Sequence, residues 1–255
     1  MVVLISIYRV WQRYFAVFRK NLLYGLVTTF VEPLLYLISF GFGLGSLVGT
    51  IQSGNIEVSY RAFVLAGIVG QAVLFQSFFE ASYGGFIRMY YQRIFHAIAY
   101  TPVTLSEVLW GELIWNASRA TLSATVVLVL GIAVGDFSIV GSLLLLPFCF
   151  LAALVFAALG LFVAAKSRTI DTISYPQYLL IFPMFLFCGV FFPISNLPQP
   201  IRTIAGVLPL APVVSLVRTL NLGFPFEPLG LVFLLLFAIL IIPLSRRAMF
   251  NRLVP

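Results

Sequence analysis

Six long apolar stretches constrain this chain more than any other feature of its sequence. At about 1.5 Å per helical residue, each approaches or exceeds the roughly 30 Å hydrocarbon core of a bilayer. Charged residues make up only 9% of the chain, whereas soluble domains average about 25%. The sequence therefore predicts a single all-α integral membrane domain over residues 1–255. The predicted spans are residues 22–48, 62–86, 105–134, 139–165, 173–191 and 228–245.

Residues 1–20 precede the first span and separate apolar from basic side chains with a helical period. On a helical wheel the apolar and aromatic residues fill one arc, and the basic residues fill the opposite arc. Such a helix lies in the plane of the membrane interface rather than across it. We therefore predict an interface helix whose apolar arc consists of Leu4, Ile7, Tyr8, Trp11, Tyr14, Phe15 and Phe18.

Residues 87–104, between the second and third spans, form the most polar helix-like segment away from the two ends. Arg88, Gln92 and His96 recur at i, i+4 and i+8, opposite an apolar side. This spacing predicts a short amphipathic helix that lies along the membrane and presents one basic face to water. We interpret that face, together with Arg93, as a surface on which another protein docks.

Residues 192–225 are apolar but interrupted by prolines, so they suit neither a single span nor a solvated loop. Two short helices, near 200–208 and 211–222, fit this pattern as a re-entrant pair. Backbone of this kind is tolerated at membrane depth only where protein buries it or where it lines a wet cavity.

The basic residues are distributed unevenly between the two sides that six spans define. Most of the 15 Lys and Arg residues fall in segments on the same side as the amino end. The positive-inside rule then places both termini, the 87–104 segment and the 166–171 loop in the cytosol, with the polar loop 49–61 outside. The same rule explains the net charge of +7 without nucleic acid as a partner.

Several polar residues fall inside predicted spans. On the third span, Glu112, Asn116, Arg119 and Ser123 follow i, i+4, i+7 and i+11 spacing and so share one helical stripe. An ionised residue at this depth faces a bundle interior or a wet path. Two interpretations stay open: Arg119 pairs with Glu32 or Glu112 to hold helices in register, or the stripe lines the route of a polar substrate. Glu80, near the inner end of the second span, is a further intramembrane acid.

The sequence offers little for catalysis within the chain. It has no GxxxxGK[ST] phosphate loop, no HExxH and no GxSxG motif, and His96 is its one histidine. We therefore expect no catalytic residues, no metal and no cofactor in this chain. Cys149 and Cys188 both lie in apolar runs and are interpreted as packing residues.

Several motifs together resemble those of a known family. They are residues 32–36 (EPLLY), 41–45 (GFGLG), 59–63 (SYRAF) with 66–67, 111–112, 188–198 (CGVFFPISNLP), 208–210 (LPL) and 216–218 (LVR). Over essentially its whole length the chain resembles type-2 ABC exporter permeases. The resemblance is strongest to the lipooligosaccharide branch, which includes nodulation-factor export permeases.

This resemblance implies a multi-pass protein of the bacterial cytoplasmic (inner) membrane that works as a homodimer with separate ABC ATPase subunits. Residues 1–20 would be the interface helix and residues 87–104 the coupling helix, so that Arg88, Gln92, Arg93 and His96 contact the ATPase. Residues within 192–225 would form extracellular re-entrant helices. Besides membrane lipid, the partner would be an amphipathic lipid or glycan cargo, moved with energy from the ATPase.

Three other functions remain compatible with the residues themselves. The first is a drug or antibiotic exporter of the same architecture. The second is a membrane-embedded transferase that uses Glu32, Glu80 and Glu112. The third is a passive channel or scaffold.

Overall fold

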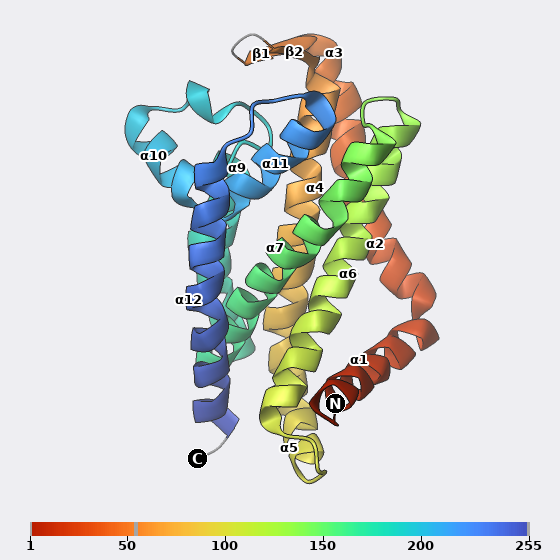
Figure 1. The fold of residues 1–255 in the computed structure, drawn as a ribbon, viewed down its shortest axis with the longest axis vertical. Helices are drawn as coiled ribbons and strands as arrows, with labels where there is room; N and C mark the ends of the chain where they lie inside the picture. The colour runs from red at the N-terminus through yellow and green to blue at the C-terminus, as the bar shows by residue number, and fades with distance from the viewer. Residues whose placement is uncertain (1, 54–55, 254–255) are drawn as a thin grey trace.

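The computed structural model describes residues 2–53 and 56–253 (Figure 1). Within these ranges nothing is described for the side chains of Val2, Tyr24, Leu26, Thr28, Ser53, His96 and Ala99. In chain order the elements are α1 (Val2–Lys20), α2 (Leu22–Tyr36), η1 (Leu37–Leu44), α3 (Gly45–Val48), β1 (Thr50–Ser53), β2 (Ile56–Ser59), α4 (Tyr60–Phe79), η2 (Glu80–Gly84), η3 (Ile87–Tyr91), α5 (Ile94–Ala99), α6 (Leu105–Ala133), α7 (Ile139–Lys166), η4 (Ile170–Ile173), α8 (Ser174–Pro176), η5 (Gln177–Ile181), α9 (Phe182–Phe187), η6 (Ile194–Asn196), α10 (Gln199–Val207), α11 (Leu210–Leu222) and α12 (Pro228–Leu253).

The architecture confirms the predicted all-α integral membrane class. Among the described residues, five helices are long and apolar enough to cross a membrane. They are Thr29–Val48, Tyr60–Tyr91, Leu105–Ala133, Ile139–Lys166 and Pro228–Leu253. The bent pair of α10 and α11 becomes a sixth candidate when it is counted as one span.

The stretch predicted as the fifth span, 173–191, is not one regular helix. It consists of a 3₁₀ turn (η4), the short α8, a π-helical turn (η5) and α9, which ends at Phe187. Pro176 and Pro183 lie within it, and each lacks the backbone N–H that a continuous helix needs. The interruptions therefore fall where the prolines remove donors.

The predicted pair of short helices in 192–225 is present as α10 and α11, with an 82° bend between them. A buried arginine holds this pair against the bundle. Arg218 on α11 donates from Nη2 to the carbonyl oxygens of Phe63 (3.2 Å) and Gly189, and its guanidinium lies 3.5 Å from the Phe63 ring centroid. Only 7% of Arg218 is exposed.

Helix α4 forms the centre of the molecule. Its membrane-spanning stretch is 89% buried, and α6, α7 and α11 pack around it. Two glycines permit this close approach. A Cβ on Gly70 would lie 2.7 Å from Val214 Cγ2 of α11, and one on Gly160 of α7 would lie 2.7 Å from the Phe78 carbonyl oxygen. Small residues at such crossings let helix backbones touch, which is how membrane helices associate without a hydrophobic driving force.

The polar segment predicted as a loop over 49–61 contains two short strands, β1 and β2. Strands β1 and β2 pair antiparallel, with Thr50 opposite Ser59 and Ile51 opposite Val58. Strand β2 leads directly into α4, because the Ser59 hydroxyl accepts a hydrogen bond from the Ala62 N–H at 3.2 Å and caps the helix.

The predicted boundary between the second span and the 87–104 helix is wrong. The span continues from α4 through the π-helical turns η2 and η3 to Tyr91. The chain then breaks at Arg93, a non-glycine residue with φ of 50°. Only α5, six residues long, follows before a capping box between Thr104 and Glu107 starts α6. Residues 87–104 are therefore not one amphipathic helix.

Candidate functional site: a charged network beside a cavity

Four charged residues from two helices form one connected network inside the bundle. Arg88 Nη1 lies 2.9 Å from Glu80 Oε1, and Arg88 Nη2 contacts Glu112 Oε1. The second oxygen of Glu80 accepts from Arg119 Nη1 at 2.6 Å. The order of contacts is thus Glu112, Arg88, Glu80 and Arg119, with opposite charges alternating. Pairing of this kind offsets the cost of taking each charge out of water.

A glycine and a π-helical turn allow Glu80 and Arg88, which lie on one helix, to come into contact. In a regular α-helix, residues eight apart differ by about 80° around the axis and about 12 Å along it. The wider π turn η2 lies between Glu80 and Arg88 and changes this register. Gly84 leaves room for the contact between Arg88 and Glu80, because a Cβ there would lie 2.9 Å from Arg88 Nη1 and 3.0 Å from Glu80 Oε1.

The predicted polar stripe of α6 turns toward the bundle interior. Glu112 and Asn116 are fully buried, and Asn116 Nδ2 donates to Glu112 Oε1 at 3.4 Å. Ser123 is also buried. The partner of Arg119 is Glu80, so the pairing we had considered with Glu32 or Glu112 is wrong. The arginine that Glu112 pairs with is Arg88.

Helix α1 covers the network with two aromatic rings. The guanidinium of Arg88 lies 5.3 Å from the ring centroid of Tyr14, and that of Arg119 lies 5.2 Å from the ring centroid of Phe18. Both rings also pack against Trp115 of α6. Stacking on aromatic faces stabilises cations that have left water. Helix α1 therefore contributes directly to the site.

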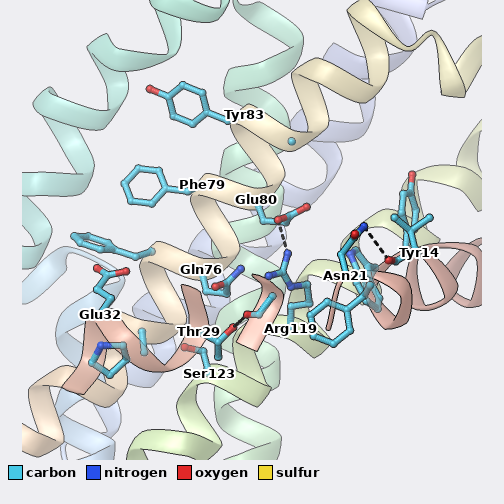
Figure 2. A pocket seen from close by; sticks show the side chains of 18 of the residues that line it. Tyr14, Asn21, Thr29, Glu32, Gln76, Phe79, Glu80, Tyr83, Arg119 and Ser123 are labelled. Carbon is cyan, nitrogen blue, oxygen red and sulfur yellow. Dashed lines mark hydrogen bonds and ion pairs between the residues drawn. The ribbon is translucent and has the colours of Figure 1, made fainter. Parts of the chain in front are cut away.

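The network forms one side of a cavity of about 480 Å³ between α1, α2, α4 and α6. Figure 2 shows Arg119 and Glu80 on one side of this space, with Glu32, Thr29 and Ser123 toward the other. Ligand pockets typically occupy about 300–1,000 Å³. The lining residues are Tyr14, Val17, Phe18, Asn21, Gly25, Thr29, Glu32, Pro33, Gln71, Ala72, Phe75, Gln76, Phe79, Glu80, Tyr83, Gly84, Arg88, Trp115, Arg119 and Ser123.

Glu32 supplies a second polar position in the cavity wall. Its Oε1 accepts a hydrogen bond from Gln71 Nε2 at 2.9 Å, and no described arginine or lysine forms an ion pair with it. The aromatic side chains of Phe75, Phe79 and Tyr83 lie along the same wall. The cavity thus combines a carboxylate, an ion-pair network and a broad apolar surface.

Some buried polar atoms in and beside the cavity have hydrogen-bonding capacity to spare. Among the described residues, Arg88 Nε and Gln71 Oε1 make no hydrogen bond. Burial, together with the nearby Glu112 charge, raises the pKa of the Tyr14 phenol well above its ordinary value. The phenol therefore stays protonated at neutral pH and remains a donor.

The four residues predicted to contact a partner do not lie together. Arg88 lies inside the bundle, with its side chain only 13% exposed, so its predicted place on a water-facing helix is wrong. Gln92 and Arg93 are exposed and line a groove of about 710 Å³, which we call the α5 groove. The side chain of His96 lies outside the described part of the structure. The full lining of the α5 groove is Met89, Tyr90, Gln92, Arg93, Ala97, Tyr100, Arg252 and Leu253.

Sequence reasoning missed several residues that build the site. Tyr14 and Phe18 were assigned to the membrane-facing arc of α1, and Gln71 and Gly84 were given no role. The i, i+4 spacing of Tyr14 and Phe18 was a usable signal, because it places both rings on one side of α1. That this side faces two arginines depends on tertiary packing.

Comparison with known proteins shows the family. Residues 6–222 match the model of a family described as ABC-2 type transporter. The chain is 34% identical over 248 residues to Nodulation protein J of Rhizobium meliloti, covering 96% of this chain and 93% of that one. It is 35% identical over 213 residues to Nodulation protein J of Bradyrhizobium diazoefficiens, covering 84% and 80%. It is also 21% identical over 220 residues to the Inner membrane transport permease YadH of Escherichia coli, covering 86% and 83%.

Proposed function

Because this chain belongs to the ABC-2 type transporter family and is the permease subunit of an ABC exporter, we propose that its cargo is a lipid-linked glycan. The cargo enters or passes the cavity between α1, α2, α4 and α6. A separate ABC ATPase drives the movement, and two copies of this chain form the membrane pathway.

The chemistry of the cavity wall supports an amphipathic cargo. Phe75, Phe79 and Trp115 offer an apolar surface for a lipid chain, whereas the Gln76 amide can donate and accept hydrogen bonds and the Glu32 carboxylate can accept them. A hydroxyl-rich headgroup both donates and accepts, so it suits this combination. An apolar pocket with few, well-placed polar groups is the usual form of a ligand site.

The charges favour a neutral headgroup over an anionic one. Arg88 and Arg119 are already paired with Glu80 and Glu112, so neither cation is free for a phosphate. Glu32 adds a carboxylate that no described cation neutralises. The motif resemblance to the lipooligosaccharide branch, which includes nodulation-factor export permeases, agrees with a glycan-bearing lipid.

The pairing of the acids also argues against the transferase that we considered. General acid–base work needs a carboxyl group free to exchange a proton near neutral pH. Glu80 is held by two arginines and Glu112 by one, so neither carboxyl group is free to approach a substrate. Glu32 alone does not form a pair of catalytic carboxyls.

The α5 groove supports the proposed ATPase contact. It presents Arg93 and Arg252 among exposed tyrosines, at the end of the molecule where α5 lies in Figure 1. The helix that carries Arg88 ends directly at this groove, three residues after Arg88. A push on α5 would therefore reach Glu80 and Arg119 through the ion-pair network. This arrangement agrees with both termini in the cytosol and the protein in the bacterial inner membrane.

A homodimer would cover a face that one copy leaves open. Val27, Val31, Leu35, Ile38 and Phe42 are all exposed on α2 and η1, and only 17% of this span is buried. Because α2 also lines the cavity, a second copy against α2 would complete the cavity wall.

Reconstitution with the ATPase tests the proposed cargo. Proteoliposomes that contain both subunits should move a fluorescent lipid-linked oligosaccharide on addition of ATP, and should move the same lipid without its glycan much less. Glu32→Gln should change the preference between the two lipids at unchanged protein yield. Equal transport of a hydrophobic drug, with no transport of the glycolipid, would support the drug exporter instead.

A further inference from the structure

We propose that the face of α12 opposite the cargo cavity binds one anionic phospholipid, with its phosphate at Arg246 and Arg247 and an acyl chain in an adjoining apolar groove. This site uses none of the residues that line the cargo cavity. The proposed lipid site requires only that α12 lies in a membrane.

The apolar part of the site is a groove of about 330 Å³ between α7, α11 and α12. Its lining is hydrophobic throughout, and several of the lining side chains, such as Leu151 and Leu235, are exposed to the surroundings of the protein. The lining residues are Leu145, Phe148, Cys149, Leu151, Leu154, Val155, Pro212, Val213, Leu216, Leu231, Leu234, Leu235, Ala238 and Ile242.

The groove leads to a second hollow at the carboxyl end of α12. Ile242 lines both of them, and the second hollow, of about 420 Å³, is bordered by Trp110, Arg246 and Arg247. Arg246 lies with its guanidinium 5.6 Å from the Phe250 ring centroid. Neither Arg246 nor Arg247 forms an ion pair with a described acidic side chain. Their positive charge is therefore free to bind an anion.

The dimensions match one leaflet of a bilayer. At about 1.5 Å per residue, Ile242, Ala238 and Leu235 lie roughly 6, 12 and 17 Å from Arg246 along α12. Half of the hydrocarbon core is about 15 Å. A lipid whose phosphate sits at Arg246 would therefore place its acyl chain along these three residues. Trp110 borders the same hollow, and indole rings prefer the headgroup region of a bilayer.

The charge decides which lipid fits. A zwitterionic lipid carries its own cation, so two arginines add little to its binding free energy. An anionic lipid gains about 1 kcal/mol of binding free energy from each basic residue near the membrane surface. Only 17% of the α12 span is buried, so lipid can reach this face. The apolar groove explains why the ligand is a lipid rather than free phosphate.

Native mass spectrometry of the purified full-length protein tests the site. Titration with phosphatidylglycerol should give one bound lipid per chain at about thirtyfold lower concentration than phosphatidylcholine. Arg246→Gln with Arg247→Gln should abolish this preference. The matched control, Lys166→Gln with Arg168→Gln, removes two exposed charges from the end of α7 and should leave it unchanged.

A second pair of variants tests the groove. Ala238→Phe fills the groove and should weaken binding of both lipids, whereas Ile239→Phe alters a neighbouring side chain that is 72% exposed and does not line the groove. Inorganic phosphate at the same concentrations should not bind. Equal binding of both lipids to the wild type, loss of preference in the control pair, or full binding to Ala238→Phe would overturn the proposal.

Discussion

Glu80 and Arg88 lie eight residues apart on one helix, and yet Arg88 Nη1 is 2.9 Å from Glu80 Oε1. The contact crosses Gly84 and joins the end of the helix nearest the α5 groove to the wall of the cargo cavity. Because Glu80 also holds Arg119, this one carboxylate connects α4 with α6. The proposed coupling between the ATPase and the cavity depends on these contacts of Glu80 with Arg88 and Arg119.

Replacement of Glu80 should destabilise the protein more than replacement of Arg119. Glu80→Gln leaves Arg119 without its acidic partner and Arg88 with Glu112 alone, and loss of one member of a buried pair costs about 3–5 kcal/mol. Arg119→Gln leaves Glu80 still bound to Arg88. Thermal unfolding in detergent should therefore show a lower midpoint for Glu80→Gln. Equal midpoints would mean that Glu80 does not carry both contacts.

A methyl group at Gly84 should separate the pair. Gly84→Ala places a Cβ about where Arg88 Nη1 and Glu80 Oε1 now approach it, so one of them has to move. We expect reduced transport and a lower unfolding midpoint. Gly206→Ala is the matched control, because nothing lies within 4 Å of the added Cβ on that exposed helix. Transport and an unfolding midpoint equal to those of the wild type would contradict the close contact of Arg88 and Glu80 beside Gly84.

The ring of Tyr14 should hold α1 on the bundle. Tyr14→Ala removes both the contact with Trp115 and the stacking over Arg88, whereas Tyr14→Phe keeps the ring. Hydrogen exchange of the α1 amides should accelerate in the alanine variant and change little in the phenylalanine variant. Tyr8, which is 55% exposed, provides the control substitution Tyr8→Ala. Unchanged exchange in Tyr14→Ala would show that other contacts hold α1.

Charge reversal at Arg93 should uncouple the ATPase. Arg93→Glu changes the exposed α5 groove, and we expect cargo-stimulated ATP hydrolysis to fall at unchanged protein yield. Arg93→Gly removes the charge but suits the φ of 50°, so comparison of the two separates charge from backbone strain. Arg168→Glu, a reversal on the exposed 166–171 loop, is the control. Normal coupling in Arg93→Glu would exclude the groove as the contact.

Hydropathy and amphipathic periodicity were sufficient for much of this architecture. The interface helix, the long spans and the pair of helices in 192–225 all follow from local patterns, because membrane helices must satisfy their backbone groups within themselves. The two paired strands within 50–59 were missed, although Gly54-Asn55 is a recognised two-residue turn signal.

The site was less predictable because its charged residues are stabilised by ion-pair partners distant in sequence. Arg88 looked like the start of a water-facing helix, since an arginine normally ends an apolar run. It is tolerated inside because Glu112, 24 residues later, neutralises it together with Glu80. The spacing of Glu112 and Arg119 correctly indicated an interior stripe. No local pattern could assign Glu80 as the partner of Arg119.

Transport by liposomes of defined composition tests whether a separate ATPase drives export of a lipid-linked glycan through this permease. We predict that the permease with its ATPase moves the lipid-linked oligosaccharide only when ATP is present, and that the permease alone moves none against a gradient. Accumulation of the glycolipid by the permease alone, without ATP or the second subunit, would contradict the account.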